Sequence, residues 1–219
     1  MNIPFIDIHT HHPVFCDEII SVQSLFLQHI DLKNEIHGPF TAAIHPWHAE
    51  GSTLGQVNEM LSNLISQTGL IAIGETGLDK VCKADFGQQK LIFDLHLHFA
   101  DNLHIPMVIH CVKAWNELIV YLKVAKVPII LHGYSSGKVL TKQLMDLGCY
   151  FSVGKQAINP AQGFRESMQI IPPASLFIET DDSGANIQEI YLGVSKIIEI
   201  PVQELKIQIN KNFKNLFPK

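Results

Sequence analysis

The sequence has no long apolar run, no paired cysteines and no excess of positive charge, and each absence excludes a class of protein. None of its apolar stretches approaches the roughly 20 residues that a helix needs to cross a bilayer. The N-terminal segment has neither the basic region nor the apolar region of a signal peptide. The four cysteines are scattered and include no CxxC pair, which suits reduced thiols. We therefore expect a cytoplasmic protein with no membrane contact.

The charge balance limits what the chain can attract by itself. Its formal net charge is −5, so there is no general basic field that would draw in nucleic acid. An anionic substrate would have to be held mainly by metal. No segment indicates an obligate protein partner.

The composition is that of a globular protein with a large core. Of the 219 residues, 47% are hydrophobic and 17% are charged. The sequence contains no internal repeat, no low-complexity stretch and no segment that resembles a long linker. We expect one domain over residues 1–219.

Short apolar segments with strand character alternate with segments of helical periodicity. The expected strands are 5–11, 19–26, 41–45, 70–76, 107–111, 129–132, 150–153 and 176–180. The expected helices are 54–67, 88–102, 114–126, 138–147, 161–170, 187–198 and 203–217. This alternation is typical of a parallel sheet, and eight strands favour an α/β fold closed into a (β/α)8 TIM barrel. The interval 28–39 is too short for a full helix, so we expect an irregular barrel.

Six residues that can bind metal stand at or just past the ends of these strands. They are His9, His11, Glu75, His110, His132 and Asp181. The carboxyl ends of the strands of such a barrel lie at the end that carries the active site. The fold would therefore gather four imidazoles and two carboxylates at one place. This placement predicts a metallohydrolase.

The first strand carries the sharpest local pattern, in the segment FIDIHTH. Its period of two places Asp7, His9 and His11 on one face of the strand. Two imidazoles at i and i+2 can bind one cation together, and Asp7 is placed to orient one of the rings through a hydrogen bond. His96 and His98 are also two apart, but they lie in a helical segment where such residues do not share a face, so we expect them to be structural.

The other four candidate metal ligands are more convincing as a set than one by one. Glu75 lies among glycines that let the backbone turn closely around a ligand, and its carboxylate can bridge two cations. His110 and His132 each end an apolar run, where either one alone is explained as a hydrogen-bonded core histidine. Asp181 ends the segment LFIETD, where a buried charge needs a cation or an equivalent partner. Packing alone does not explain six such positions.

The motifs DIHTHH, AIHPWH, IGETGLD, PMVIHCVKAW, ILHGYSSG, FIETD and NKNFKNLF resemble the TatD family of metal-dependent deoxyribonucleases, within the amidohydrolase-like barrels. The resemblance runs in order over nearly the whole chain. It implies hydrolysis of phosphodiester bonds, as a 3′-to-5′ exonuclease on single-stranded DNA or on a small phosphodiester, supported by magnesium or manganese.

The resemblance also implies a ligand arrangement around two divalent cations. His9, His11, Glu75 and Asp181 would surround one cation, and Glu75, His110 and His132 the other, with Glu75 shared. In the same way His45 would lie near the scissile phosphate.

The chain departs from the family at two places. The family commonly has an arginine soon after the histidine that matches His110, whereas here Val112 and Lys113 follow Cys111. The family usually has a proline-containing loop after the ETD motif, whereas here Asp182, Ser183 and Gly184 lead almost directly to a helix. The metal site is therefore expected to carry over more fully than the DNA specificity.

The ligand set predicts roles in catalysis. Asp181 is our choice for the general base, Glu75 for the carboxylate that both cations share, and His45 for a hydrogen-bond donor to the developing charge, although His45 is equally explained as a packing residue. Asp79 and Lys113 are candidates for substrate contact, for which a solvated loop position and a surface lysine are the more ordinary explanations.

Metal identity and reaction class stay open at this point. Imidazole-rich ligands favour zinc, manganese or iron, whereas the resemblance points to magnesium or manganese. A small-molecule hydrolase for an ester, amide, lactone or phosphate on the same dinuclear barrel is one alternative. A barrel protein without catalysis is the other.

Overall fold

The structure, a computed structural model, describes residues 3–30 and 36–217. Its strands are β1 (Phe5–Thr10), β2 (Ile19–Phe26), β3 (Phe40–Ala43), β4 (Leu70–Asp79), β5 (Met107–Val112), β6 (Ile129–Leu131), β7 (Tyr150–Val153) and β8 (Leu176–Ile178). Their order along the sheet follows the chain, from β1 to β8. Where their registers are defined, β1 and β2, β3 and β4, β4 and β5, and β7 and β8 pair in parallel.

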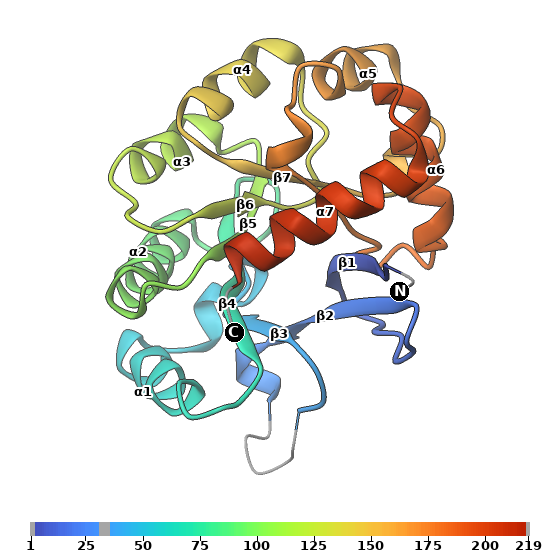
Figure 1. The fold of residues 1–219 in the computed structure, drawn as a ribbon. Helices are drawn as coiled ribbons and strands as arrows, with labels where there is room; N and C mark the ends of the chain where they lie inside the picture. Colours follow the sequence, from blue (N-terminus) through green and yellow to red (C-terminus); the bar gives the residue numbers. More distant parts are fainter. Residues whose placement is uncertain (1–2, 31–35, 218–219) are drawn as a thin grey trace. The chain divides into compact units, whose positions relative to one another are not determined.

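The helices fill the intervals between the later strands (Figure 1). The α-helices are α1 (Leu54–Leu64), α2 (Phe86–Leu103), α3 (Trp115–Leu122), α4 (Lys138–Asp146), α5 (Gln162–Met168), α6 (Ile187–Ile198) and α7 (Val202–Leu216). Short 3-10 helices are η1 (Leu27–His29), η2 (Pro46–Gly51), η3 (Lys155–Ala157) and η4 (Pro173–Ser175).

This element order confirms the predicted (β/α)8 class and its irregular start. No α-helix is described between β1 and β2, and η1 is the helical element described between β2 and β3 within residues 3–30 and 36–217. Part of the short interval 28–39 lies outside the described residues. Strand β4 is the main difference from expectation, because it continues to Asp79 rather than ending at Thr76.

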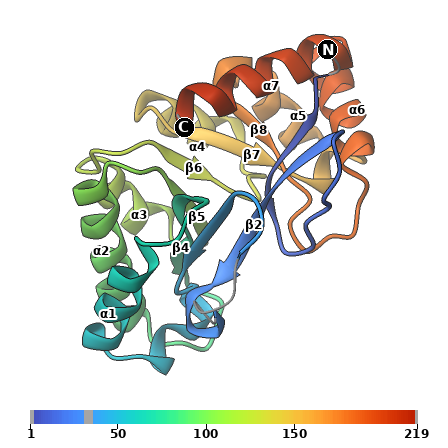
Figure 2. The ribbon, with the colours of Figure 1, turned by 60° about the horizontal axis from the view of Figure 1, so that its bottom comes forward.

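The chain comprises two compact units, and the expectation of one domain over residues 1–219 stays a prediction. Unit 1 consists of Met1–Gln23 and Leu131–Lys219, and unit 2 of Ser24–Ile130. In unit 1, α7 packs along β1 and β8, and α6 packs against α7 (Figures 1 and 2). In unit 2, α2 covers β4 and contacts α1.

The buried side chains of unit 2 illustrate why the apolar segments form strands and helices. In unit 2, the strands bury Ala72 and Ile73 of β4 and Ile109 of β5, and helix α2, which packs against β4, buries Phe93. Burying an isoleucine or phenylalanine side chain stabilises the fold by roughly 1.5–3 kcal/mol. Among the described residues, no helix combines the length and the apolar character that a bilayer span requires. The four cysteines are free thiols.

Candidate metal centre

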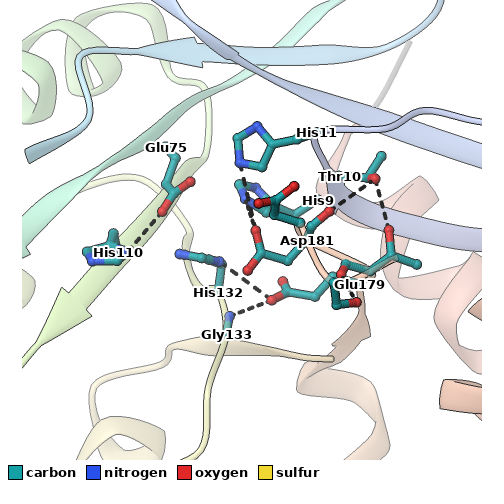
Figure 3. A network of polar contacts seen from close by, with 12 residues as sticks. His9, Thr10, His11, Glu75, His110, His132, Gly133, Glu179 and Asp181 are labelled. Atoms are coloured by element: carbon teal, nitrogen blue, oxygen red, sulfur yellow. Dashed lines mark hydrogen bonds and ion pairs between the residues drawn. The ribbon is translucent and has the colours of Figure 1, made fainter. Parts of the chain in front are cut away.

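Unit 1 carries one group of three potential metal ligands, His9, His11 and Asp181. The ligand atoms of the three side chains all lie within 4.8 Å of one another. His9 Nε2 and His11 Nε2 lie 3.7 and 3.8 Å from Asp181 Oδ1 (Figure 3). The His9 side chain is fully buried, whereas 42% of the Asp181 side chain is exposed. Asp181 was expected to be a buried charge, so its exposure corrects that expectation.

The backbone explains why Asp181 lies beside the first strand. Asp181 N donates to the His9 carbonyl oxygen over 2.9 Å, and His11 N donates to the Asp181 carbonyl oxygen over 3.3 Å. A parallel bridge joins Thr10 and Asp181. The residue takes a left-handed conformation, with a φ of 54°. The end of β1 and the segment after β8 are thus fixed to each other at the ligands.

Asp7 does not orient an imidazole, which corrects the sequence-based expectation. Its Oδ1 accepts from Thr180 N over 2.9 Å and its Oδ2 accepts from Thr180 Oγ1 over 2.7 Å. Burial raises the pKa of the Asp7 carboxyl to about 6, against the hydrogen bonds from Thr180, which lower it. Asp7 therefore holds the segment that precedes Asp181.

Glu179, which sequence reasoning missed, holds His132 in unit 1. Its Oε1 lies 3.5 Å from His132 Nδ1 and accepts from Gly133 N over 2.6 Å (Figure 3). Burial alone would raise the pKa of Glu179, but the hydrogen bond and charge of His132 outweigh it, so the pKa falls below its usual range. The clue in the sequence was the i, i+2 spacing of Glu179 and Asp181 in FIETD.

Unit 2 carries a second group of three potential ligands, His45, Glu75 and His110. Their ligand atoms also lie within 4.8 Å of one another. Glu75 Oε1 is 3.0 Å from His45 Nε2 and 2.9 Å from His110 Nδ1. The Glu75 side chain is 4% exposed and that of His45 is 3% exposed. His45 was thus placed beside the predicted ligands, although the sequence left a packing role equally open.

Local backbone geometry sets the tautomer of His45. Its Nδ1 accepts from Trp47 N over 3.2 Å, at the start of η2. A neutral imidazole with an accepting Nδ1 carries its proton on Nε2. His45 therefore donates that proton to the Glu75 carboxylate.

Glycines let β4 approach β5 at the ligands. A Cβ built at Gly77 would overlap the carbonyl oxygen of His110, and one at Gly74 would lie 2.6 Å from the carbonyl oxygen of Val108. No other residue fits these positions without moving the backbone of β5. This close approach accounts for the glycines on both sides of Glu75.

Asp79 is buried at the end of β4 rather than solvated in a loop. Its side chain is 6% exposed, and its Oδ2 accepts from Trp47 Nε1 over 2.8 Å and lies 3.4 Å from His110 Nε2. Burial would raise the pKa of Asp79, but hydrogen bonds from Trp47, Val81 N and Cys82 N lower it overall. The sequence favoured the solvated position, and this expectation is wrong.

The remaining candidate, Lys113, follows β5 as an exposed residue with a φ of 53°. The segment after Asp181 forms a different contact from any that the sequence suggested. His12 Nε2 and Asp182 Oδ1 lie 2.8 Å apart at the surface. Beside them a pocket of about 420 Å³ is lined by residues that include Asp7, Asp181 and Asn186.

Comparison with known proteins identifies a family that matches most of the chain. The family described as TatD related DNase matches residues 17–218. The chain belongs to this TatD-related family.

Curated members of the TatD-related family share moderate identity with the chain. The 3′-5′ ssDNA/RNA exonuclease TatD of Klebsiella pneumoniae (strain 342) is 30% identical over 149 residues, which are 64% of this chain and 56% of that protein. The uncharacterized metal-dependent hydrolase YcfH of Escherichia coli (strain K12) is 24% identical over 222 residues, which are 93% of this chain and 83% of that protein. The match thus spans just over half of the first relative.

Solved structures of TatD-related proteins share the fold. YJJV, a TatD homolog from Escherichia coli K12, has a TM-score of 0.80 at 22% identity, over 100% of both chains. A TatD family hydrolase from Entamoeba histolytica has a TM-score of 0.79 at 16% identity, over 100% of this chain and 99% of that one. The fold of these proteins is therefore similar to that of this chain over its aligned length.

The donor chemistry of each group suits a divalent cation. His9, His11 and Asp181 in unit 1, and Glu75 and His110 in unit 2, offer the nitrogen and oxygen atoms that bind Zn²⁺, Mn²⁺ and Fe²⁺, whereas His45 engages both of its nitrogens in hydrogen bonds. In unit 1, the His132 ring also lies 4.4 Å, centroid to centroid, from that of His9, so a further imidazole adjoins the group. The relative YcfH, which is described as a metal-dependent hydrolase, supports the use of divalent metal.

Proposed function

We propose that the chain is a metal-dependent nuclease that removes nucleotides from the 3′ end of single-stranded DNA. The observation that carries this proposal is the pair of ligand groups, each with one carboxylate beside imidazoles and each made of residues near or just past the carboxyl ends of barrel strands, except Glu75, which lies within β4. Membership of the TatD-related family supports the reaction class. The Klebsiella pneumoniae relative, which is described as a 3′-5′ ssDNA/RNA exonuclease, supports the substrate and the polarity.

We further propose that the two groups serve one centre with two divalent cations. His9, His11, Glu75 and Asp181 would hold one cation, and Glu75, His110 and His132 the other. The carboxyl ends of all strands in a (β/α)8 barrel meet at one end, which would bring the two groups together. Glu179 then keeps the His132 ring in place through its carboxylate.

When bound, such a pair of cations lowers the pKa of water and neutralises charge on a phosphodiester. Asp181 accepts the proton of the attacking water, and its 42% exposed side chain is open to that water. His45 donates through Nε2 toward the charge that develops on the phosphate oxygen, in place of its bond to Glu75. Lys113, exposed after β5, offers a cation to the phosphate backbone of the substrate.

We propose manganese or magnesium as the working cation, with zinc as the alternative that the imidazoles favour. Four free thiols suit the reducing cytoplasm that we expect for this protein. No obligate protein partner enters the proposal.

The test uses single-stranded oligonucleotides labelled at the 3′ or the 5′ end, with protein reconstituted with manganese, magnesium or zinc. We expect stepwise shortening from the 3′ end that stops with chelator and in Asp181→Asn. Shortening from the 5′ end would overturn the polarity. No cleavage by protein that holds metal would overturn the nuclease and favour a small-molecule hydrolase acting at the pocket of about 420 Å³ beside Asp181.

A further inference from the structure

We propose that Trp47 is a platform on which a base of the substrate stacks, and that Asp79 positions its ring. The inference rests on the proposed function, and it assigns recognition of the base to unit 2. Asp79 thereby acts through Trp47 rather than by direct contact with substrate.

Trp47 is exposed in a way that packing does not explain. It lies in η2, and 57% of its surface is accessible to solvent. Its indole N–H is nevertheless bound to Asp79 Oδ2 over 2.8 Å. An exposed aromatic ring that is held by a buried carboxylate keeps a fixed orientation, so less freedom is lost when a ligand stacks on it.

Asp79 is itself held from several directions. Its Oδ1 accepts from Val81 N over 2.7 Å and from Cys82 N over 3.2 Å. Its backbone N–H donates to Gln89 Oε1 over 2.8 Å, and Gln89 Nε2 donates back to the Asp79 carbonyl oxygen over 3.0 Å. Gln89 is 1% exposed and lies on α2. The hydrogen bonds that hold Asp79, and through it Trp47, therefore extend to a buried residue of unit 2.

The ring adjoins the ligand group of the same unit. The Trp47 ring centroid is 4.6 Å from that of His45, with 79° between the planes, and 6.1 Å from that of His110. Asp79 Oδ2, which binds Trp47, also lies 3.4 Å from His110 Nε2. A base that stacks on Trp47 therefore belongs to a nucleotide whose phosphate is close to His45.

Stacking is the interaction that suits this substrate. Every base offers an aromatic face, so a stacking platform binds single strands with little preference for sequence. The chain has a net charge of −5 and thus lacks the general basic surface that holds single strands elsewhere. An aromatic contact beside the metal ligands supplies affinity that charge does not.

Fluorescence can follow Trp47 directly, because the chain has only two tryptophans. In a Trp115→Phe variant, Trp47 is the only tryptophan left. This variant is titrated, with metal present, with a short hydrolysis-resistant phosphorothioate oligonucleotide and with an abasic strand of the same length. We expect the strand with bases to quench Trp47 emission and the abasic strand to leave it nearly unchanged.

Affinity gives the second readout, measured by anisotropy of a labelled phosphorothioate strand. Trp47→Leu should weaken binding of the strand with bases about tenfold, since one stacked base is worth about 1–3 kcal/mol. Trp47→Phe, which keeps an aromatic face, should restore most of that loss. Equal affinity of wild type and Trp47→Leu, with normal cleavage, would overturn this inference alone. Absence of both binding and cleavage in metal-loaded wild type would overturn the proposed function as well.

Asp79 is tested by the motion of the ring. In the Trp115→Phe background, Asp79→Ala should lower the time-resolved anisotropy of Trp47, whereas Asp79→Asn, which keeps an oxygen for the indole N–H, should keep most of it. A Trp47 anisotropy that Asp79→Ala does not change would remove the positioning role of Asp79.

Discussion

Each ligand group contains two imidazoles and one carboxylate, but the two groups differ in the exposure of these side chains to solvent. In unit 1, the carboxylate of Asp181 is 42% exposed and His11 is 19% exposed. In unit 2, Glu75 is 4% exposed and is already bonded to both of its imidazoles. A buried carboxylate exchanges little with solvent, which suits a ligand that keeps its cation. An exposed one is suited to exchanging water and protons with a substrate.

The supports of the two groups differ as well. In unit 1, Tyr191 of α6 binds Ile6 of β1, donating to its carbonyl oxygen and accepting from its N–H, each over 3.1 Å. In unit 2, His96 of α2 accepts from Ile44 N over 3.1 Å, next to His45. Tyrosine keeps its proton through the ordinary pH range, whereas histidine can gain one. The two groups should therefore respond differently to acid.

The largest effect is expected from Asp181→Asn. Removing this carboxylate removes the proposed general base, so the cleavage rate should fall about 10³-fold, while the melting temperature hardly changes because the side chain is half exposed. Initial rates on a 5′-labelled strand measure this. Asp182→Asn, one residue away and exposed, is the control and should stay within about threefold of wild type. A similar loss in both variants would mean that general charge, rather than one base, matters.

Glu179→Gln should weaken metal binding about 10–100-fold. The substitution keeps the shape but removes the charge that holds His132, and residues that orient a metal-binding histidine have effects of this size. Titration calorimetry with Mn²⁺ measures the affinity, with Glu189→Gln on the exposed side of α6 as control. An affinity equal to wild type would show that His132 does not need Glu179.

Acid should destabilise the chain through His96. Burial lowers the pKa of His96 to about 4 from its usual 6.5, so the unfolded chain takes up the proton first. The stability that neutral His96 contributes is fully present above pH 6.5 and is lost as the pH falls toward 4. Wild type should lose about 2 kcal/mol more than His96→Gln between pH 7 and 4.5, measured by urea unfolding.

His98→Gln on the exposed face of α2 is the matched control for that comparison. It should follow wild type at each pH. If His96→Gln and wild type lost equal stability with acid, His96 would not be the sensitive group of unit 2.

The smallest effect is expected from Tyr191→Phe. Losing the hydroxyl leaves the buried backbone N–H and carbonyl of Ile6 without this partner, which costs about 1–2 kcal/mol at every pH from 4.5 to 7. Urea unfolding at both ends of this range checks the value. A cost that changes with pH would contradict the contrast with His96.

Much of the scaffold could be predicted from periodicity. The bounds of β2, β7 and α6 agree with the expected segments, because each is an apolar pattern between clear breaks. Strand β4 runs past its expected end, since Gly77 lets the chain stay close to β5 where a glycine would ordinarily signal a turn. The hydrophobic pattern of one segment does not show how closely it pairs with another strand.

The site was predictable where ligands sit at strand ends, and less so where they depend on contacts across the chain. The family resemblance grouped His9, His11, Glu75 and Asp181, and unit 1 brings the first two and Asp181 together. Sequence reasoning missed Glu179, whose partners His132 and Gly133 are about 46 positions away. It also missed the bond from Trp47 to Asp79, which joins a 3-10 helix to a strand end. The i, i+2 spacing of Glu179 and Asp181 is a local clue to Glu179, but no local pattern shows which distant residue either contact reaches.

We have proposed that the two ligand groups serve one metal centre in which Glu75 is shared. Metal content per chain, measured by plasma mass spectrometry after reconstitution with Mn²⁺ and desalting, tests it in wild type, Asp181→Asn and Glu75→Gln. We expect about two ions in wild type, about one in Asp181→Asn, and fewer than about one in Glu75→Gln. Equal metal content in wild type and Glu75→Gln would contradict it.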